Sequence, residues 1–563
     1  MTLASRRRVN RLRLGPIVGH TDDTSTRVWI RVFDDPRRYT LRIQGAGVVP
    51  FVGTEAVPEF RTGLATARGL RPDFSYRYQV LRNGRLVTGA AGRFRTMPQP
   101  GSLADLLFVA VSCNRQFFDG DWTALGEFIE SSKPRFLLLT GDQIYLDDDK
   151  PNLFKEHLES RPAVRRDAIA QRYQENWGRD PVRRVLARIP TYMMWDDHEI
   201  RDGWGSSPGD SETMVERFPR GAEIFAKFNA FFYDARDVYW HFQRCRAPLP
   251  IDSSDPAIPN YIGDAPPAGQ KRAMPYAFRC GRMVVLLVDP RGDRDAFRKE
   301  LPTLGAEQWA FIDTVTGALA ADVEQLVLVT AAPIASLDPK GQSQTLVGSR
   351  TDDVAHFKRG DLEGLLNLPG DEDFGALAQA AVGSNLSAIT GRRFNIGPFK
   401  QSKILDARDQ WGHKLNRDEQ LRLIRTVGEA RTSNRTNSNP RSVLFLSGDV
   451  HVGAIYEITS AKPRYRALSL TSSGISNFTD SSFLLSIVLD ENFEVGPGVR
   501  SRLLEFVTEF NFGVVYVQPT GAAARTVPVI AHKGNSFAWG LDFTPLLDGS
   551  LLKPPGTVLR RNL

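Results

Sequence analysis

The stretch FLLLTGDQIY, residues 136–145, joins an apolar run to polar residues that can take part in chemistry. Phe136–Thr140 is too short for a typical helix, and its apolar residues do not alternate with polar ones. Such a run is typical of a strand that is buried on both faces of a sheet. Asp142 and Tyr145 follow within five residues. The stretch therefore predicts a buried strand that ends in candidate functional side chains.

Similar apolar runs recur along the chain after residue 102. They are Leu106–Val111, Tyr192–Trp195, Met283–Val288, Leu326–Thr330 and Val443–Leu446. Helix-like segments lie between several of them, at Trp122–Ser131, Ala163–Trp177, Glu212–Ala235, Glu307–Leu319 and Asp418–Ala430. Strands that are apolar on both sides and alternate with helices predict an α/β domain with covered sheets.

The first hundred residues have a different pattern. Thr26–Phe33 and Ser75–Arg82 alternate between apolar and polar residues, and Asn83-Gly84 predicts a hairpin turn. We expect a small, fibronectin-like β-sandwich over residues 1–100 and a catalytic domain over 101–500. The catalytic domain has an insertion near 336–410, rich in Gly, Asp and Asn. Residues 501–563 are predicted to add strands and a Pro-rich tail.

The composition indicates a soluble globular protein. The chain has 563 residues, of which 41% are hydrophobic and 24% charged, and its net charge of +7 does not indicate nucleic-acid binding. Three cysteines do not form a disulfide framework. No run is long enough for a membrane span, and no apolar segment follows the basic start. The expected location is therefore cytoplasmic, or periplasmic or secreted if a signal was removed. Nothing in the sequence indicates an oligomeric state.

Chemically distinctive residues follow five of the apolar runs. The five exits read SCNR (112–115), GDQIY (141–145), DDHEIRD (196–202), DPRGDR (289–294) and SGDVH (447–451). In α/β sheets, ligands bind beyond the carboxyl ends of strands. Each exit alone is readily explained as a turn or a helix cap. Together they favour a metal site, because caps rarely need Cys, Tyr and His, and clustered carboxylates are costly without a cation.

The ordered set SCN, GDQIY, WDDHE, DPRGDR and SGDVH resembles the PhoD-type alkaline phosphatases and phosphodiesterases, within the calcineurin-like metallophosphoesterase class. The resemblance runs from about residue 105 to 475. It implies a four-layer α/β/β/α sandwich preceded by a small β-sandwich. It also implies a multinuclear site with Fe3+ and Ca2+, although other divalent metals remain possible.

The resemblance also assigns roles to residues. It places Cys113, Asp142 and Tyr145 on iron-ligand positions, and Asp197, Asp449 and His451 on the remaining ligand positions. It matches His198 to the histidine that contacts the phosphate and protonates the leaving group.

The chemistry of these residues agrees with that implied site. Carboxylate and phenolate oxygens suit a hard cation, and a metal lowers the pKa of a bound water to give hydroxide. Arg291 is the main candidate for binding phosphate oxygens, since a guanidinium group favours bidentate hydrogen bonds. Asn114, Arg115 and Arg294 are further substrate-binding candidates. For Arg115 and Arg294 a surface ion pair is an equal alternative.

Two departures from the family pattern concern the calcium side. Asp202-Gly203 stands where an Asp-Asn pair is frequent, and Leu146 stands where an acidic residue is often expected. The iron-side ligands are therefore better supported. The predicted function is metal-dependent hydrolysis of a small phosphoester, either a monoester or a diester. The alternative is a non-catalytic metal-containing protein that binds a partner through the β-sandwich or the insertion. A nuclease would need a basic stripe beside the site.

Overall fold

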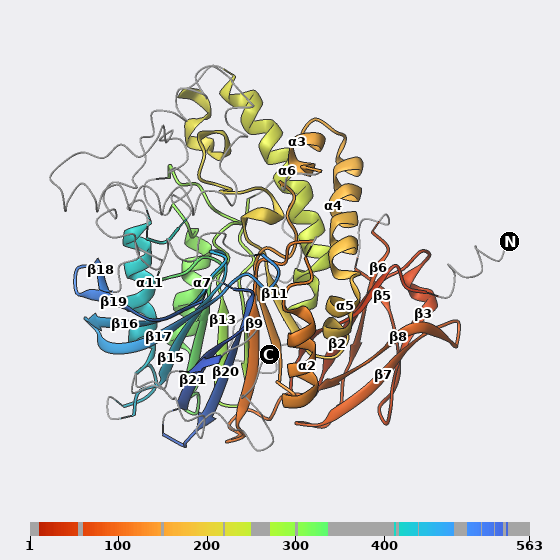
Figure 1. Ribbon diagram of the computed structural model, residues 1–563, viewed down its shortest axis with the longest axis horizontal. Coiled ribbons are helices and arrows are strands. Elements are labelled where there is room, and N and C mark those ends of the chain that lie inside the picture. Colours follow the sequence, from red (N-terminus) through yellow and green to blue (C-terminus); the bar gives the residue numbers. More distant parts are fainter. Residues whose placement is uncertain are drawn as a thin grey trace.

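The computed structural model shows several sheets covered by helices (Figure 1). It describes residues 11–54, 60–116, 118–147, 151–217, 220–248, 271–298, 302–335, 410–412, 416–436, 439–477, 492–507, 509–522, 524–532 and 536–538. The predicted insertion near 336–410 therefore lies outside the described residues, except for Gln410. So does most of the predicted C-terminal tail.

Two four-stranded sheets form near the N-terminus, drawn in red and orange in Figure 1. One has the order β1 (Leu14–Thr21), β2 (Thr26–Arg31), β6 (Thr62–Ala67) and β5 (Val52–Gly53). The other has the order β4 (Gly47–Pro50), β3 (Tyr39–Ile43), β7 (Ser75–Arg82) and β8 (Arg85–Arg95). The predicted hairpin is present, because β7 pairs with β8 across Asn83 and Gly84, which both have positive φ. Inward-facing residues of the two sheets share one apolar core.

The first of two larger sheets has six strands. Their order is β11 (Thr191–Met194), β10 (Leu137–Thr140), β9 (Leu106–Val111), β20 (Asn511–Pro519), β21 (Ala524–His532) and β22 (Ser536–Ala538). Strands β9, β10 and β11 are parallel, whereas β20 runs antiparallel to β9. The carboxyl ends of the three parallel strands consequently lie at one edge of the sheet.

The second large sheet has eight strands. Their order is β12 (Tyr276–Cys280), β13 (Met283–Leu287), β14 (Gln325–Val329), β15 (Ser442–Ser447), β17 (Arg464–Ser472), β16 (Gly453–Ala461), β19 (Val499–Val507) and β18 (Asn492–Gly496). Strands β13, β14, β15 and β17 are parallel neighbours. Their carboxyl ends form a second edge that can supply side chains to a shared site.

The two large sheets pack face to face, and helices cover their outer faces. On β9, Phe108 and Ala110 enter the core between the sheets, whereas Val109 and Val111 face the helical side. This two-residue period explains why the strand is apolar throughout. The helices over the first sheet are α2 (Trp122–Ser132), α4 (Pro162–Trp177), α5 (Asp180–Leu186) and α6 (Gly221–Phe242), and those over the second are α7 (Ala306–Gly317) and α11 (Arg417–Ala430). The predicted α/β/β/α sandwich is confirmed.

One helix differs from the sequence-based expectation. The segment predicted as one helix over Glu212–Ala235 begins as a 3-10 helix at Glu212–Arg217, and α6 starts only at Gly221. Pro219 lies between them and lacks the N–H that a continuous helix needs. The expected C-terminal strands are present, since β20, β21 and β22 complete the six-stranded sheet. The division of the chain into three domains stays a prediction. Among the described helices, none has the length and apolar character that crossing a bilayer requires.

Candidate metal centre

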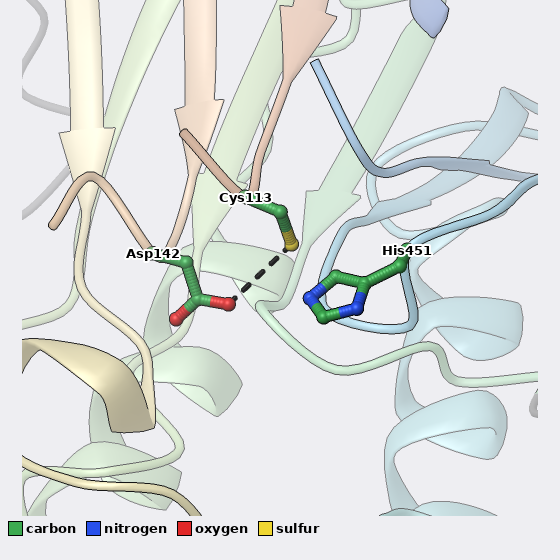
Figure 2. Close-up of side chains that lie close together, drawn as sticks. All are labelled: Cys113, Asp142 and His451. Carbon is green, nitrogen blue, oxygen red and sulfur yellow. Dashed lines mark hydrogen bonds between the residues drawn. The ribbon is translucent and has the colours of Figure 1, made fainter. Parts of the chain in front are cut away.

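Polar residues from both large sheets meet at the carboxyl ends of the strands. Figure 2 shows Cys113 after β9, Asp142 after β10 and His451 after β15 pointing toward one another. Cys113, Asp142, Asp449 and His451 all have positive φ, between 53° and 74°. Non-glycine residues rarely adopt this conformation, and such strain concentrates at functional sites. The turns therefore direct these side chains inward at a cost in backbone energy.

The first group of possible metal ligands consists of Cys113, Asp142 and His451. Their candidate donor atoms all lie within 4.8 Å of one another. Cys113 Sγ is 3.4 Å from Asp142 Oδ2, and Tyr145 Oη is 3.2 Å from His451 Nε2. The structure thus brings the three residues predicted for the iron side together with His451, which was predicted for one of the remaining ligand positions. Sulfur, carboxylate, phenol and imidazole donors together suit a transition metal.

The second group is richer in carboxylates. Asp142, Asp196, Asp197 and Asp449 have oxygens within 4.8 Å of one another, and Asp142, Asp197 and His198 form an overlapping set. Asp142 belongs to every group, so its carboxylate lies where it could bridge two ions. The structure places every predicted ligand in one cluster and adds Asp196, for which no role was predicted.

The state of Asp142 fits a bound cation. Its carboxylate is buried, and Oδ1 has no hydrogen-bond partner among the described residues. Burial, followed by the charge of Cys113, raises the pKa of Asp142 well above its usual value. An ionised carboxylate that is buried and only partly hydrogen-bonded is costly unless a positive charge is close. A metal ion would supply that charge and satisfy the orphaned oxygen.

Cys113 is set up as a thiolate. Burial opposes its ionisation, but the charge and hydrogen bonding of His451 and the hydroxyls of Ser112 and Ser473 lower its pKa to about 6. The thiolate is the form that binds metals. Cys245 and Cys280 contrast with it, because burial raises the pKa of each thiol, to about 11 and about 12 respectively.

Arg291 lies against the second group. Its guanidinium is buried, donates from Nε to Asp196 Oδ1, and has Nη2 3.7 Å from Asp197 Oδ2. Burial would raise the pKa of Asp197, but Arg291 and His198 lower it below its usual value. In this arrangement Arg291 neutralises carboxylates. Its predicted contact with phosphate stays a prediction.

His198 lies between acidic side chains. Its Nδ1 is 2.8 Å from Asp147 Oδ1, and its ring centroid is 4.2 Å from that of Tyr145. Burial alone would lower the pKa of His198, but Asp147, Asp197 and Asp142 outweigh it and raise the pKa well above the usual value. These carboxylates therefore favour the imidazolium form of His198, in which a histidine can donate a proton.

The three predicted substrate-binding residues have different surroundings. Asn114 is buried, and its Oδ1 accepts hydrogen bonds from Trp122 Nε1 (2.9 Å) and Arg179 Nη2 (2.7 Å). Arg294 is also buried and donates to hydroxyls of Ser206 and Thr303, outside the cluster. These hydrogen bonds join Asn114 and Arg294 to residues other than the predicted ligands.

Arg115 is different, because it is only half-buried and reaches the cluster through one intermediate. Its Nη1 is 3.5 Å from Asn477 Oδ1, and Asn477 contacts two predicted ligands. Arg115 is therefore placed toward the metal centre.

The exit of β17 supplies residues that the sequence interpretation missed. Ser473 Oγ is 3.0 Å from Cys113 Sγ and accepts the backbone N–H of His451 at 2.8 Å. Asn477 Nδ2 lies 3.2 Å from Tyr145 Oη and 3.1 Å from His451 Nε2. The sequence contains only a weak indication of a functional strand end here, because β17 is not wholly apolar and no charged residue follows it directly.

Glu199 fixes the positions of two exits. Its buried carboxylate accepts backbone N–H groups of Asp142 (3.0 Å), Gln143 (2.7 Å) and Asp196 (2.8 Å). Gly203, at the departure noted in the sequence, donates its backbone N–H to Asp197 Oδ2 at 2.8 Å. Backbone N–H groups thus orient the carboxylates of Glu199 and Asp197. No sequence motif reveals these hydrogen bonds.

Two facing sheets with covering helices, and ligand-type side chains at their strand ends, make up a metallophosphoesterase-type fold. Residues 108–320 match the family described as PhoD-like phosphatase. A solved structure of PhoD is similar over 94% of this chain and 90% of its own, with a TM-score of 0.57 and 16% identity. These findings confirm the resemblance to the PhoD-type phosphatases.

A purple acid phosphatase, PPD1 from yellow lupin (Lupinus luteus) seeds, is similar at a TM-score of 0.46 and 11% identity. That similarity covers 97% of this chain and 77% of the lupin chain. Among curated proteins, none matches the sequence significantly.

Proposed function

We propose that this protein hydrolyses phosphate monoesters or diesters with metal ions held at the cluster around Asp142. The observation that supports this most is that three overlapping groups of ligand-type side chains share the Asp142 carboxylate. The PhoD-like match over residues 108–320 supports phosphoester hydrolysis as the reaction.

The donor types support a division between two ions. Cys113, Tyr145 and His451, with Asp142, would hold Fe3+, because phenolate and carboxylate oxygens suit a hard trivalent ion and the ion would keep the thiol and the phenol deprotonated. Asp197 and Asp449, again with Asp142, would hold Ca2+ or another divalent ion through oxygen alone. When bound, the ions would supply Lewis-acid chemistry and activate a water.

The remaining residues would act on the phosphate and the leaving group. His198 lies beside Asp147, whose carboxylate favours the imidazolium form, and would donate a proton to the departing alkoxide or phenoxide. Arg115, half-buried next to Asn477, would bind a non-bridging phosphate oxygen. Arg291 would keep the charge of Asp196 and Asp197 balanced while an anionic substrate enters.

Replacing Asp142 with Asn tests the proposal. Because Asp142 is common to all groups, Asp142→Asn should lower hydrolysis of an aryl phosphate or a bis-aryl phosphate by about 1000-fold or more. Its bound metal should also fall, as measured by elemental analysis. Asp313→Asn changes a carboxylate paired with Arg422 on the surface and should keep full activity. Full activity in Asp142→Asn would overturn the proposal.

Metal content and turnover together separate this function from the alternative. A non-catalytic binding protein would contain metal yet hydrolyse no ester in a broad panel. A visible spectrum adds the identity of the ion, because phenolate or thiolate on ferric iron gives a charge-transfer band. A colourless, iron-free but active protein would overturn the iron assignment.

A further inference from the structure

Phe118 is an exposed aromatic residue on the segment that joins β9 to α2. Its side chain is 41% exposed, among the few large apolar side chains on the described surface. Most of the others, Phe33, Val48, Val52, Phe74 and Leu86, belong to the N-terminal sheets and their loops. Phe118 instead follows the exit that carries Cys113, at the edge of the sheet where ligands bind.

The backbone around Phe118 is held in place. Arg179 Nη1 donates a hydrogen bond to the carbonyl of Phe118, and the N–H of Asp121 donates to the carbonyl of Ile475 at 2.9 Å. Gly120 has a φ of +49°, and a Cβ there would lie 1.9 Å from the Ile475 carbonyl oxygen. This close approach requires glycine and clamps the segment onto the exit of β17. Phe118 is therefore presented by an anchored backbone.

A chain of contacts links Phe118 to the metal centre. Asn477 Nδ2 lies 3.1 Å from His451 Nε2 and 3.2 Å from Tyr145 Oη. Asn477 Oδ1 is 3.5 Å from Arg115 Nη1, and the Arg115 guanidinium carbon is 6.0 Å from the centroid of the Phe118 ring. The amide of Asn477, the guanidinium of Arg115 and the exposed ring of Phe118 therefore follow one another outward from the ligands.

We propose that Phe118 is a stacking platform for a planar aromatic group of the substrate. The inference rests on the proposed function and specifies its substrate class as phosphoesters that carry an aryl group or a nucleobase. Arg115 would bind the phosphate, and the ring beyond it would receive the aromatic part. Aromatic rings stack favourably on one another and tolerate different ring types. A single exposed apolar residue is ordinary; the anchored backbone and the intervening Arg115 distinguish Phe118.

The chain contains a matched pair away from the centre. Phe74 is 38% exposed, and the guanidinium carbon of Arg71 lies 4.4 Å from its ring centroid. This pair belongs to the N-terminal part, just before β7. It has the same chemistry as Arg115 and Phe118 but does not adjoin the strand ends. Phe74→Leu is therefore the control for Phe118→Leu.

The test compares the inhibition constants of two phosphonates that are not hydrolysed, phenylphosphonate and methylphosphonate. The wild type should bind the phenyl compound more tightly. Phe118→Leu should lower this preference about tenfold, since stacking contributes on the order of 1–3 kcal/mol. Phe118→Trp should retain the preference, because it restores an aromatic face. Phe74→Leu should show the wild-type preference.

The outcomes separate this inference from the proposed function. An unchanged phenyl-over-methyl preference in Phe118→Leu would overturn the platform. A loss of the same size in Phe74→Leu would also overturn it. If the wild type hydrolyses no phosphoester, the proposed function fails, and calorimetric binding of the two phosphonates still tests Phe118 directly. Thermal unfolding of each variant checks that the fold is intact.

Discussion

The metal centre has two halves that share Asp142 and differ in how their charge is balanced. The thiolate half consists of Cys113, Tyr145 and His451, and the carboxylate half of Asp196, Asp197 and Asp449. In the thiolate half, neutral hydroxyl and amide groups from Ser473 and Asn477 surround the ligands. In the carboxylate half, the buried guanidinium of Arg291 lies against two of the aspartates.

The two halves therefore differ in how their negative charge is stabilised when no metal ion is bound. The thiolate half carries less formal charge, and its imidazole and hydroxyl groups already stabilise the Cys113 thiolate. The carboxylate half carries several negative charges in a buried place, and Arg291 offsets part of them. We therefore expect loss of a ligand to dominate activity in the first half, and loss of the fixed cation to dominate stability in the second.

The largest expected effect is on activity, from Cys113→Ser. A hydroxyl is not ionised as the Cys113 thiol is, so the first ion should be bound weakly and hydrolysis should fall about 100-fold or more. Any charge-transfer band that arises from the thiolate should disappear from the visible spectrum.

Cys280→Ser is the matched control for that prediction. Cys280 is also a buried cysteine, but its Sγ lies near Met97 Sδ and away from the strand ends. It should keep its activity and spectrum while losing about 1–3 kcal/mol of stability through a buried hydroxyl. Equal activity in Cys113→Ser and Cys280→Ser would remove the distinction between the thiolate half and an ordinary buried thiol.

The sequence predicted most of the thiolate half, because its ligands follow runs of only apolar residues. Strands β9, β10 and β15 lie in the interior, so both faces must be apolar and the first polar residue marks the strand end. Strand β17 also lies inside a sheet but reads RYRALSLTS, with exposed Arg464 and Arg466 near its start. Its exit at Ser473 was therefore not recognised from local pattern.

The counter-charge that Arg291 supplies to the carboxylate half could not be predicted from the sequence. Arg291 follows β13 in one sheet and pairs with Asp196, which follows β11 in the other. A contact between two sheets depends on how they face each other, which no local period encodes. The same reason explains β20, which pairs with β9 from about 400 residues away. The four layers were predictable as a class through the resemblance, whereas these pairings needed coordinates.

A smaller but still large effect is expected on stability from Arg291→Met. Without the guanidinium, the buried Asp196 loses its hydrogen-bonded counter-charge, and Asp197 keeps only the neighbouring imidazole of His198. The free energy of unfolding of the metal-free protein should fall by about 3 kcal/mol, and a divalent cation should restore part of it. Chemical denaturation with and without cation measures both.

Arg93→Met is the control for the carboxylate half. Arg93 pairs with Glu130 at 2.8 Å, and both side chains are more than a third exposed. Arg93→Met should lower the free energy of unfolding far less than Arg291→Met, and added cations should not change that loss, because ion pairs near the surface contribute little to stability. A similar loss in Arg93→Met and Arg291→Met would mean that Arg291 is not a special counter-charge.

The pH dependence of the metal-free protein should report the thiolate half. The pKa of Cys113 is lowered from 9.0 to about 6 in the folded protein. Between these values the unfolded chain holds a proton that the folded protein has released. Stability should therefore rise with pH from about 6 to 9, and be lost again as pH falls through 6.

The difference between the wild type and Cys113→Ser isolates this effect. The extra slope in the wild type should be at most about 1.4 kcal/mol per pH unit, the limit for one proton. Denaturation at several pH values with a strong chelator present measures it. Parallel curves for the two proteins would show that Cys113 is not the titrating group.

The smallest expected effect concerns Ser473, which supports the thiolate half without being a ligand. Its hydroxyl lies 3.0 Å from Cys113 Sγ and accepts the N–H of His451. Ser473→Ala should cost about 1 kcal/mol of stability and raise the pKa of the Cys113 thiol, since the hydroxyl helps to lower it. Ultraviolet absorbance of the thiolate in metal-free protein follows that titration.

Ser476→Ala is the control, because it removes a hydroxyl three residues away that hydrogen-bonds to Asn114 and to the Arg115 carbonyl. It should lower stability by a similar amount without changing the titration of Cys113. Ser473→Thr should restore the wild-type titration because it keeps the hydroxyl, and a shift of equal size in Ser476→Ala would assign the effect to general loosening of the β17 exit.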